Sequence, residues 1–91
     1  MKRILITAAL LTPALTMAAM DQRTVCTHDT QERVIELVYP TGNQLPCEVR
    51  YTKDGATEVL WNAQNETQYC ETKAAEFVEK QRGWGWQCAT Q

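Results

Sequence analysis

Four cysteines constrain the fold of this chain more than any other feature. Cys26, Cys47, Cys70 and Cys88 are even in number and spread along most of the sequence. Zinc ribbons and thiol redox motifs use close C-x-x-C pairs, and this sequence contains none. We therefore expect two structural disulfides, which form and persist in oxidising compartments.

The N-terminal segment predicts export. Two basic residues, Lys2 and Arg3, precede an apolar run over residues 4–15 and then small residues up to Ala19. This is the three-part layout of a secretory signal, and the run is shorter than the about 20 apolar residues of a membrane-spanning helix. We expect a signal peptide at residues 1–19, cleaved after Ala18 or Ala19. Residues 20–91 would then be periplasmic or secreted, without membrane insertion.

The charge balance of residues 20–91 disfavours two classes of partner. Because Lys2 and Arg3 lie in the expected signal, this part has seven basic and eleven acidic residues, a net charge of −4. Nucleic-acid-binding proteins present a basic patch or stripe, and binding to anionic membranes uses clustered Lys and Arg. We expect no nucleic-acid partner and no membrane partner of this kind.

The length of about 72 residues after signal removal indicates a single domain. A chain of this size buries only about 60% of its unfolded surface, so its core alone gives little stability. A disulfide that closes a loop of about 20 residues adds roughly 3 kcal/mol through lost chain entropy. The cysteines therefore explain how so short a chain holds a fold.

Alternating apolar residues predict a small antiparallel sheet of three to four strands. We expect strands at residues 25–27, 33–39, 47–52 and 56–63, with Cys47, Val49 and Tyr51 on one face. Residues 53–55 predict a hairpin. A three-residue loop is preferred to a two-residue loop at residues 54–55, because it pairs Val49 with Val59 and Arg50 with Glu58.

A helix is predicted over residues 66–82. Asn65 can cap its N-terminus with Gln68 in the capping-box position, and Gly83 can end it. At 100° per residue, one face of this helix gathers the side chains that we expect to cover the sheet, namely Cys70, Ala74, Phe77, Val78 and Gln81.

Residues 84–89 predict a last strand, completing a disulfide-stapled α+β fold. A strand–helix–strand order suggests that this strand runs parallel to residues 56–63 after a right-handed crossover. Cys70 under the helix could then meet Cys88, so we favour the pairs Cys26–Cys47 and Cys70–Cys88. The nearest alternative is Cys26–Cys88 with Cys47–Cys70.

Groups for catalysis are scarce. The only histidine is His28, on an expected turn, and the sequence contains no serine. Disulfide formation would leave no thiolate, and the carboxylates have structural interpretations in turns, salt bridges and the solvated helix face. No metal-binding motif is present. We expect no enzyme activity, no catalytic residue, no cofactor and no metal.

Three tryptophans are the candidate binding residues. Trp61, Trp84 and Trp86 can fill a small core between helix and sheet. One or two of them can instead be exposed as anchors for a protein or glycan, since tryptophan dominates binding hot spots. The sequence leaves both possibilities open.

A resemblance that extends over nearly all of residues 20–91 is carried by four stretches: PCEVRY (46–51), LWNAQNE (60–66), YCETKA (69–74) and RGWGWQC (82–88). They resemble a family of small exported four-cysteine proteins of Gram-negative bacteria that has no known activity. The resemblance implies the compartment and the cysteine framework only.

The leading expectation for function is a non-enzymatic periplasmic binding or accessory module, with an envelope protein or a glycan as partner. Two alternatives stay open. One is a structural or stress-related envelope protein without a discrete ligand, and the other is a small inhibitor of an envelope or foreign enzyme.

Overall fold

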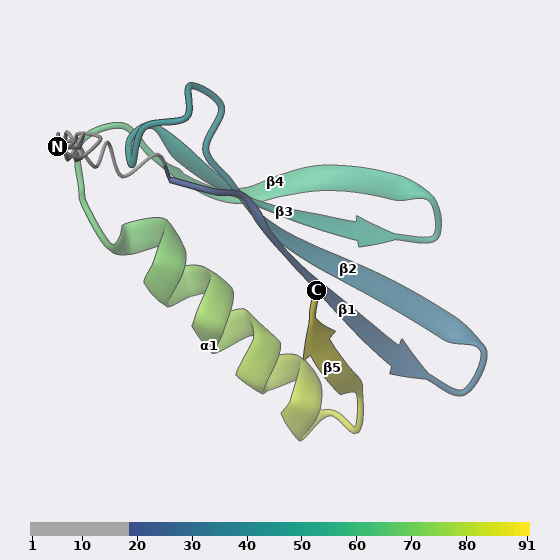
Figure 1. Ribbon diagram of the computed structural model, residues 1–91. Helices are drawn as coiled ribbons and strands as arrows, with labels where there is room; N and C mark the ends of the chain where they lie inside the picture. Colours follow the sequence, from purple (N-terminus) through teal and green to yellow (C-terminus); the bar gives the residue numbers. More distant parts are fainter. Residues whose placement is uncertain (1–18) are drawn as a thin grey trace, which may run out of the picture.

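The computed structural model describes residues 19–91 and consists of a five-stranded antiparallel sheet with one helix on one face (Figure 1). The α+β class is confirmed, but the sheet is larger than the three to four strands expected. The predicted signal peptide lies outside the described residues, except for Ala19. The elements are β1 (Gln22–His28), β2 (Gln31–Val38), β3 (Cys47–Lys53), β4 (Ala56–Ala63), α1 (Tyr69–Gly83) and β5 (Gln87–Thr90).

The strand order is β4-β3-β2-β1-β5, so β4 and β5 form opposite edges. Every neighbouring pair is antiparallel, and β5 therefore points in the same direction as β4 without lying beside it. The helix between them crosses the sheet from one edge towards the other (Figure 1). The expected direction relative to β4 is thus correct, but β5 pairs with β1 because the free edge of β1 lies where the helix ends.

The predicted disulfide pairing is wrong, and the alternative is observed: Cys26 bonds to Cys88, and Cys47 bonds to Cys70. Since β5 lies next to β1, Cys88 is directly opposite Cys26 in the ladder. Their Cα atoms are 4.0 Å apart. Cys47 begins β3 under the first turn of α1, where Cys70 faces down. The misplacement of the last strand therefore caused the wrong pairing.

The β3–β4 hairpin has the two-residue loop that we considered less favourable. Asp54 and Gly55 both have positive φ, 52° and 79°, which suits a type I′ turn. Arg50 is opposite Val59, and a bulge then restores the pairing of Val49 with Trp61.

The bulge explains why the argument from side-chain pairs failed. It places Val59 and Trp61 on opposite faces of the sheet, so Val59 is 46% exposed while Trp61 still packs under the helix. Arg50 bonds Glu48 on its own strand at 2.8 Å instead of Glu58. The bulge, which is one extra residue in β4, therefore allows both the two-residue turn and the packing of Trp61 against the core.

Helix α1 begins at Tyr69, later than the predicted start at residue 66. Gln68 precedes it with a left-handed φ of 71° and makes no side-chain cap hydrogen bond. Its carbonyl accepts the amide of Thr72, so backbone geometry replaces the expected capping box at Asn65. The predicted buried face is confirmed, with Cys70 and Gln81 buried and the three residues between them packed on the core.

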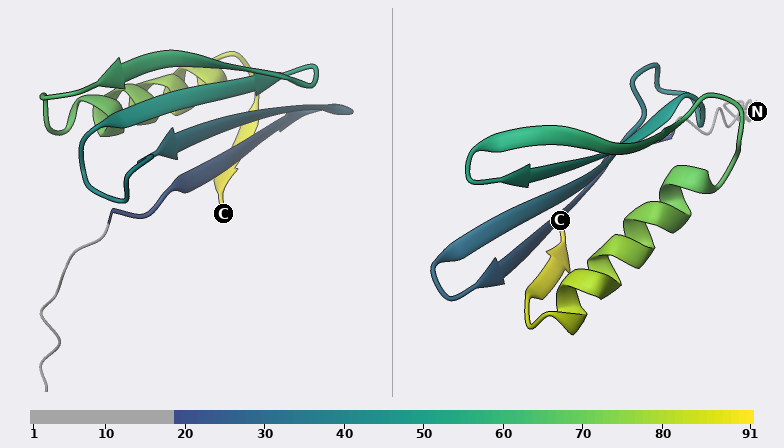
Figure 2. Two further views of the ribbon diagram at one scale, coloured as in Figure 1. Left: turned by 90° about the horizontal axis from the view of Figure 1, so that it is seen from above. Right: turned by 180° about the vertical axis from the view of Figure 1, so that it is seen from behind.

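The core lies between α1 and the sheet face beneath it. Two views from other directions show α1 on one side of the strands (Figure 2). Within residues 19–91 no other helix covers the opposite face. The buried centre contains three of the four cysteines and four aliphatic side chains, namely Cys26, Ile35, Leu37, Cys47, Val49, Ala63 and Cys70.

Candidate functional site

The two sides of α1 meet the sheet through different kinds of side chain. Towards β3 and β4, Phe77 packs edge-on against Tyr51 and Trp61, with ring centroids 4.9 and 5.6 Å away. Three aromatic rings occupy most of the space on this side and leave a smaller hollow of about 100 Å³ beside Trp61 and Phe77. We call these residues, Tyr51, Trp61 and Phe77, the aromatic side of the helix.

Towards β1, β2 and β5, α1 presents small side chains, and a groove of about 300 Å³ remains between the helix and the sheet. Ala74, Ala75 and Val78 line its helix wall, while Ile35 and Leu37 form its floor. This volume is at the lower end of the range for small-molecule sites. We call it the helix–sheet groove. Its remaining lining is polar and consists of Gln22, Thr24, Glu71, Glu79, Arg82 and Thr90.

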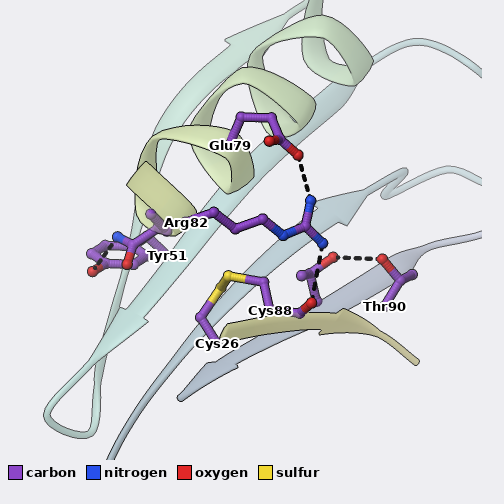
Figure 3. Close-up of a disulfide and its surroundings, with 8 residues drawn as sticks. Cys26, Tyr51, Glu79, Arg82, Cys88 and Thr90 are labelled. Carbon is purple, nitrogen blue, oxygen red and sulfur yellow. Dashed lines mark hydrogen bonds and ion pairs between the residues drawn. A yellow bond between two sulfur atoms is a disulfide. The ribbon is translucent and has the colours of Figure 1, made fainter. Parts of the chain in front are cut away.

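At the C-terminal end of α1, Arg82 connects the helix to the edge strand. Its guanidinium bonds the Glu79 carboxylate and donates to the Cys88 carbonyl at 3.0 Å (Figure 3). The Thr24 and Thr90 hydroxyls share a hydrogen bond of 3.2 Å between β1 and β5. The polar groups at this end of the groove are therefore already engaged with one another.

Near the N-terminal end of α1, Glu71 is only partly satisfied. The Tyr39 hydroxyl donates a 2.6 Å hydrogen bond to Glu71 Oε2. The other oxygen, Oε1, is buried and has no hydrogen-bond partner within residues 19–91. Leaving a buried acceptor unpaired costs about 1–3 kcal/mol. Glu71 therefore offers the groove an oxygen that can accept a hydrogen bond.

The Tyr39 hydroxyl is held in its protonated, donating form. Burial raises the pKa of Tyr39 far above its usual value of 10.0, and the hydrogen bond to Glu71 and the negative charges of Glu71 and Asp21 raise it further. Asp21 also accepts the Tyr39 backbone amide at 2.8 Å. Tyr39 consequently occupies one oxygen of Glu71 and leaves the second free.

The position of Glu71 is fixed by its neighbour in the sequence. Cys70 is fully buried and bonded to Cys47 on β3, which ties the first turn of α1 to the sheet. A binding group that follows a covalent tether loses little conformational entropy when it meets a ligand. The second disulfide, Cys26–Cys88, fixes β5 against β1 at the other end of the groove.

The three candidate tryptophans do not form one site. Trp61 lies on the aromatic side, where Lys73 Nζ is 5.8 Å from its ring centroid. Trp86 packs between the Arg33 guanidinium, at 4.8 Å, and the His28 ring, at 5.4 Å. Trp84 is 61% exposed. Of the three, Trp84 alone presents most of its surface to a partner.

Two further hollows lie on the uncovered face of the sheet, with volumes of about 490 and 500 Å³. They are larger than the helix–sheet groove but more open, and strand and turn residues line them without any contribution from α1. The first is bordered by Arg23, Glu32 and Thr52, and the second by Thr27 and Gln87. The helix–sheet groove is the better candidate because it is enclosed between α1 and the sheet and because its floor is apolar.

Within residues 19–91, no three His, Cys, Asp or Glu side chains gather in a way that could hold a metal ion. In the same residues, no helix combines the length and apolar character needed to cross a membrane.

Sequence patterns alone did not single out the groove residues. Glu71, Tyr39 and Arg82 were not selected, because each also suits an ordinary solvent-exposed position. The sequence feature that could have indicated the groove is the pair of adjacent alanines, Ala74 and Ala75, close to the bulky Phe77. It predicts a helix with small side chains on one side. That signal becomes meaningful only when the sheet opposite is known.

No protein-family model matches this chain, and no curated protein or solved structure is significantly similar to it. The resemblance to small exported four-cysteine proteins therefore stays a prediction, and the site has to be interpreted from its own geometry.

Proposed function

We propose that this chain is a non-enzymatic binding module of the periplasm or the extracellular space, and that its ligand is a small molecule held in the helix–sheet groove. The observation that carries the proposal is the combination of an apolar floor at Ile35 and Leu37 with a buried, unpaired oxygen of Glu71. A few directed polar groups on an apolar surface are typical of small-molecule sites.

The compartment is part of the proposal. One disulfide joins β1 to β5 and the other joins β3 to α1, and such bonds are rare in cytosolic proteins. Together with the predicted signal peptide they favour an exported protein. Intact-mass analysis of the protein from an envelope fraction should give a chain that starts at residue 19 or 20 with both disulfides formed. A full-length chain with free thiols would contradict this assignment.

Groove occupancy can be tested by filling the groove. Ala75→Leu places a larger side chain on the helix wall, while Ala89→Leu adds the same atoms to the shallow hollow on the opposite face. A library of small organic compounds is screened by NMR against both variants and the wild type. We expect binders to shift the methyl signals of Ala74 and Val78, to be lost in Ala75→Leu and to be kept in Ala89→Leu. Shifts confined to the opposite face would contradict the proposal.

A second candidate function rests on Trp84. Its 61% exposure is large for tryptophan, and an exposed indole can stack on a sugar ring or anchor a protein partner. Titration with peptidoglycan oligosaccharides should change the tryptophan fluorescence of the wild type and leave that of Trp84→Phe unaffected. An equal response in both proteins would exclude Trp84 as the contact.

A further inference from the structure

Glu71 defines the chemical character of one end of the helix–sheet groove. An ionised carboxylate only accepts hydrogen bonds. Tyr39 already supplies a donor to Oε2 at 2.6 Å, whereas Oε1 is buried without one in residues 19–91. Because Oε1 is already buried without a donor, a ligand that enters the groove next to Glu71 gains a hydrogen bond if it brings a donor to this oxygen.

The charges that line the groove favour a cationic donor. Glu71, Glu79 and Arg82 are its ionisable lining residues, which gives an excess of one negative charge. Arg82 is engaged by Glu79 and by the Cys88 carbonyl, so its charge is balanced at its own end. Within residues 19–91, no lysine, arginine or histidine forms a salt bridge with Glu71.

The nearest lysine along the helix does not serve Glu71. Lys73 lies over the rings of Trp61 and Tyr69, at 5.8 and 5.6 Å, and its Nζ is 4.0 Å from Glu76. These contacts hold Lys73 on the aromatic side, away from the groove. A cation for Glu71 has to come from outside residues 19–91.

Between Glu71 and Arg82 the floor and the helix wall of the groove are apolar. Ala74 and Val78 face Ile35 and Leu37 across it, and the Thr24 and Thr90 hydroxyls bond to each other. A ligand body here gains from burial, at roughly 25 cal/mol per Å² of apolar surface, and meets few unpaired polar groups.

We propose that the ligand is an amphiphilic ammonium: a protonated primary or secondary amine, which donates to Glu71 Oε1, attached to an apolar body that lies on Ile35 and Leu37. This inference rests on the proposed function, because it names the ligand class of the same groove. The ammonium forms a charge-assisted hydrogen bond, and such bonds are about twice as strong as neutral ones.

Three probes with the same hydrocarbon chain test the proposal: hexylamine, hexanol and hexanoate. Each is titrated into the wild-type protein while NMR follows the methyl groups of Ala74, Ala75 and Val78. We expect hexylamine to bind about tenfold more tightly than hexanol, because both can donate to the Glu71 carboxylate but only the ammonium adds an ionic attraction. A tenfold difference in affinity corresponds to about 1.4 kcal/mol. Hexanoate should bind most weakly.

Glu71→Gln provides the decisive variant. Glutamine keeps an acceptor for Tyr39 and nearly the same shape, but it removes the charge. The preference for hexylamine over hexanol should disappear, while the affinity for hexanol stays within about twofold. The matched control is Glu76→Gln, which removes one charge from the outer, 66% exposed part of the same helix and should keep the preference.

The outcomes separate the two proposals. If hexylamine and hexanol bind the groove of the wild type equally, the ammonium assignment is overturned and the groove function stands. If hexanoate binds best, Arg82 and not Glu71 selects the ligand, and the assignment is again overturned. If none of the probes shifts the three groove residues, the ammonium assignment fails, and the compound screen then decides on the groove itself. The wild-type comparison needs no variant and remains decisive even if Glu71→Gln folds poorly.

Discussion

The two sides of α1 cover the same sheet in different ways. On the aromatic side, Phe77 meets the rings of Tyr51 and Trp61, and these large side chains occupy most of the space. On the groove side, Ala74 and Ala75 leave a hollow bounded by charged residues. Well-packed contacts stabilise a fold, whereas an incompletely filled interface can accommodate a ligand. The aromatic side therefore mainly stabilises the fold, and the groove side is the one to which we assign ligand binding in the proposed function.

The largest expected effect concerns the two disulfides, which tie different parts of the fold together. Cys26–Cys88 joins β1 to β5 and closes a loop with a sequence separation of 62, and Cys47–Cys70 joins β3 to the first turn of α1 with a separation of 23. Loop entropy predicts losses of about 4 and about 3 kcal/mol when each pair is replaced by alanine. Urea unfolding of the two double variants measures both. A larger loss for the Cys47–Cys70 pair would mean that packing under the helix outweighs loop length.

Phe77→Ala is the next largest change. Phe77 is partly buried, so we expect a loss of about 2 kcal/mol in the free energy of unfolding, below the 3–5 kcal/mol of a fully buried phenylalanine. Ala75→Leu on the groove side should change it by less than about 1 kcal/mol, because the hollow can receive the extra atoms. Thermal or urea unfolding measures the free energy of unfolding of both variants. Similar losses for both would remove the distinction between the two sides.

Substitutions of Trp86 and Trp84 test the segment that connects α1 to β5. Trp86 contacts Arg33, whose side chain is only 9% exposed, and His28. We expect Trp86→Ala to lose about 1–2 kcal/mol through lost packing and the cation–π contact. Trp84→Ala should lose under about 0.5 kcal/mol, as for most surface positions. Iodide quenching provides an independent check: removal of Trp84 should abolish most of the quenchable fluorescence.

Tyr39 gives the smallest effect, at alkaline pH. Its folded-state pKa is raised above the unfolded value of 10.0, so the folded state favours the protonated phenol. The resulting stability is fully present below pH 10.0 and is lost as the pH rises above it. Tyr39→Phe should therefore have a shallower decline of unfolding free energy in alkaline solution than the wild type. Parallel declines in the two proteins would argue against the Tyr39–Glu71 hydrogen bond.

Local patterns predicted the parts of this fold that depend on local geometry. The period of the helix correctly placed Cys70, Phe77 and Gln81 towards the sheet, and the alternation in β3 correctly placed Val49 there. These assignments hold because a helix or strand fixes the direction of each side chain along its own axis.

Features that depend on distant pairing were not predictable in the same way. The β4 bulge shifts the register by one residue in the middle of the strand, and no turn residue marks it. The position of β5 depends on which sheet edge is free when the helix ends. The groove depends on Ala74 of the helix and Leu37 of the sheet lining one hollow, and no sequence period connects these two positions.

The strand order has a consequence for how the chain matures. Strand β1 lies between β2 and β5, so it obtains one neighbour from the residues that directly follow it and the other only from residues 87–90. During synthesis, β1 therefore keeps an unpaired edge until nearly all of the described chain has been made. Over the same interval Cys26 lacks its disulfide partner Cys88. An oxidant that acts too early could join Cys26 only to Cys47 or Cys70, and that bond would have to be exchanged before β5 could pair with β1.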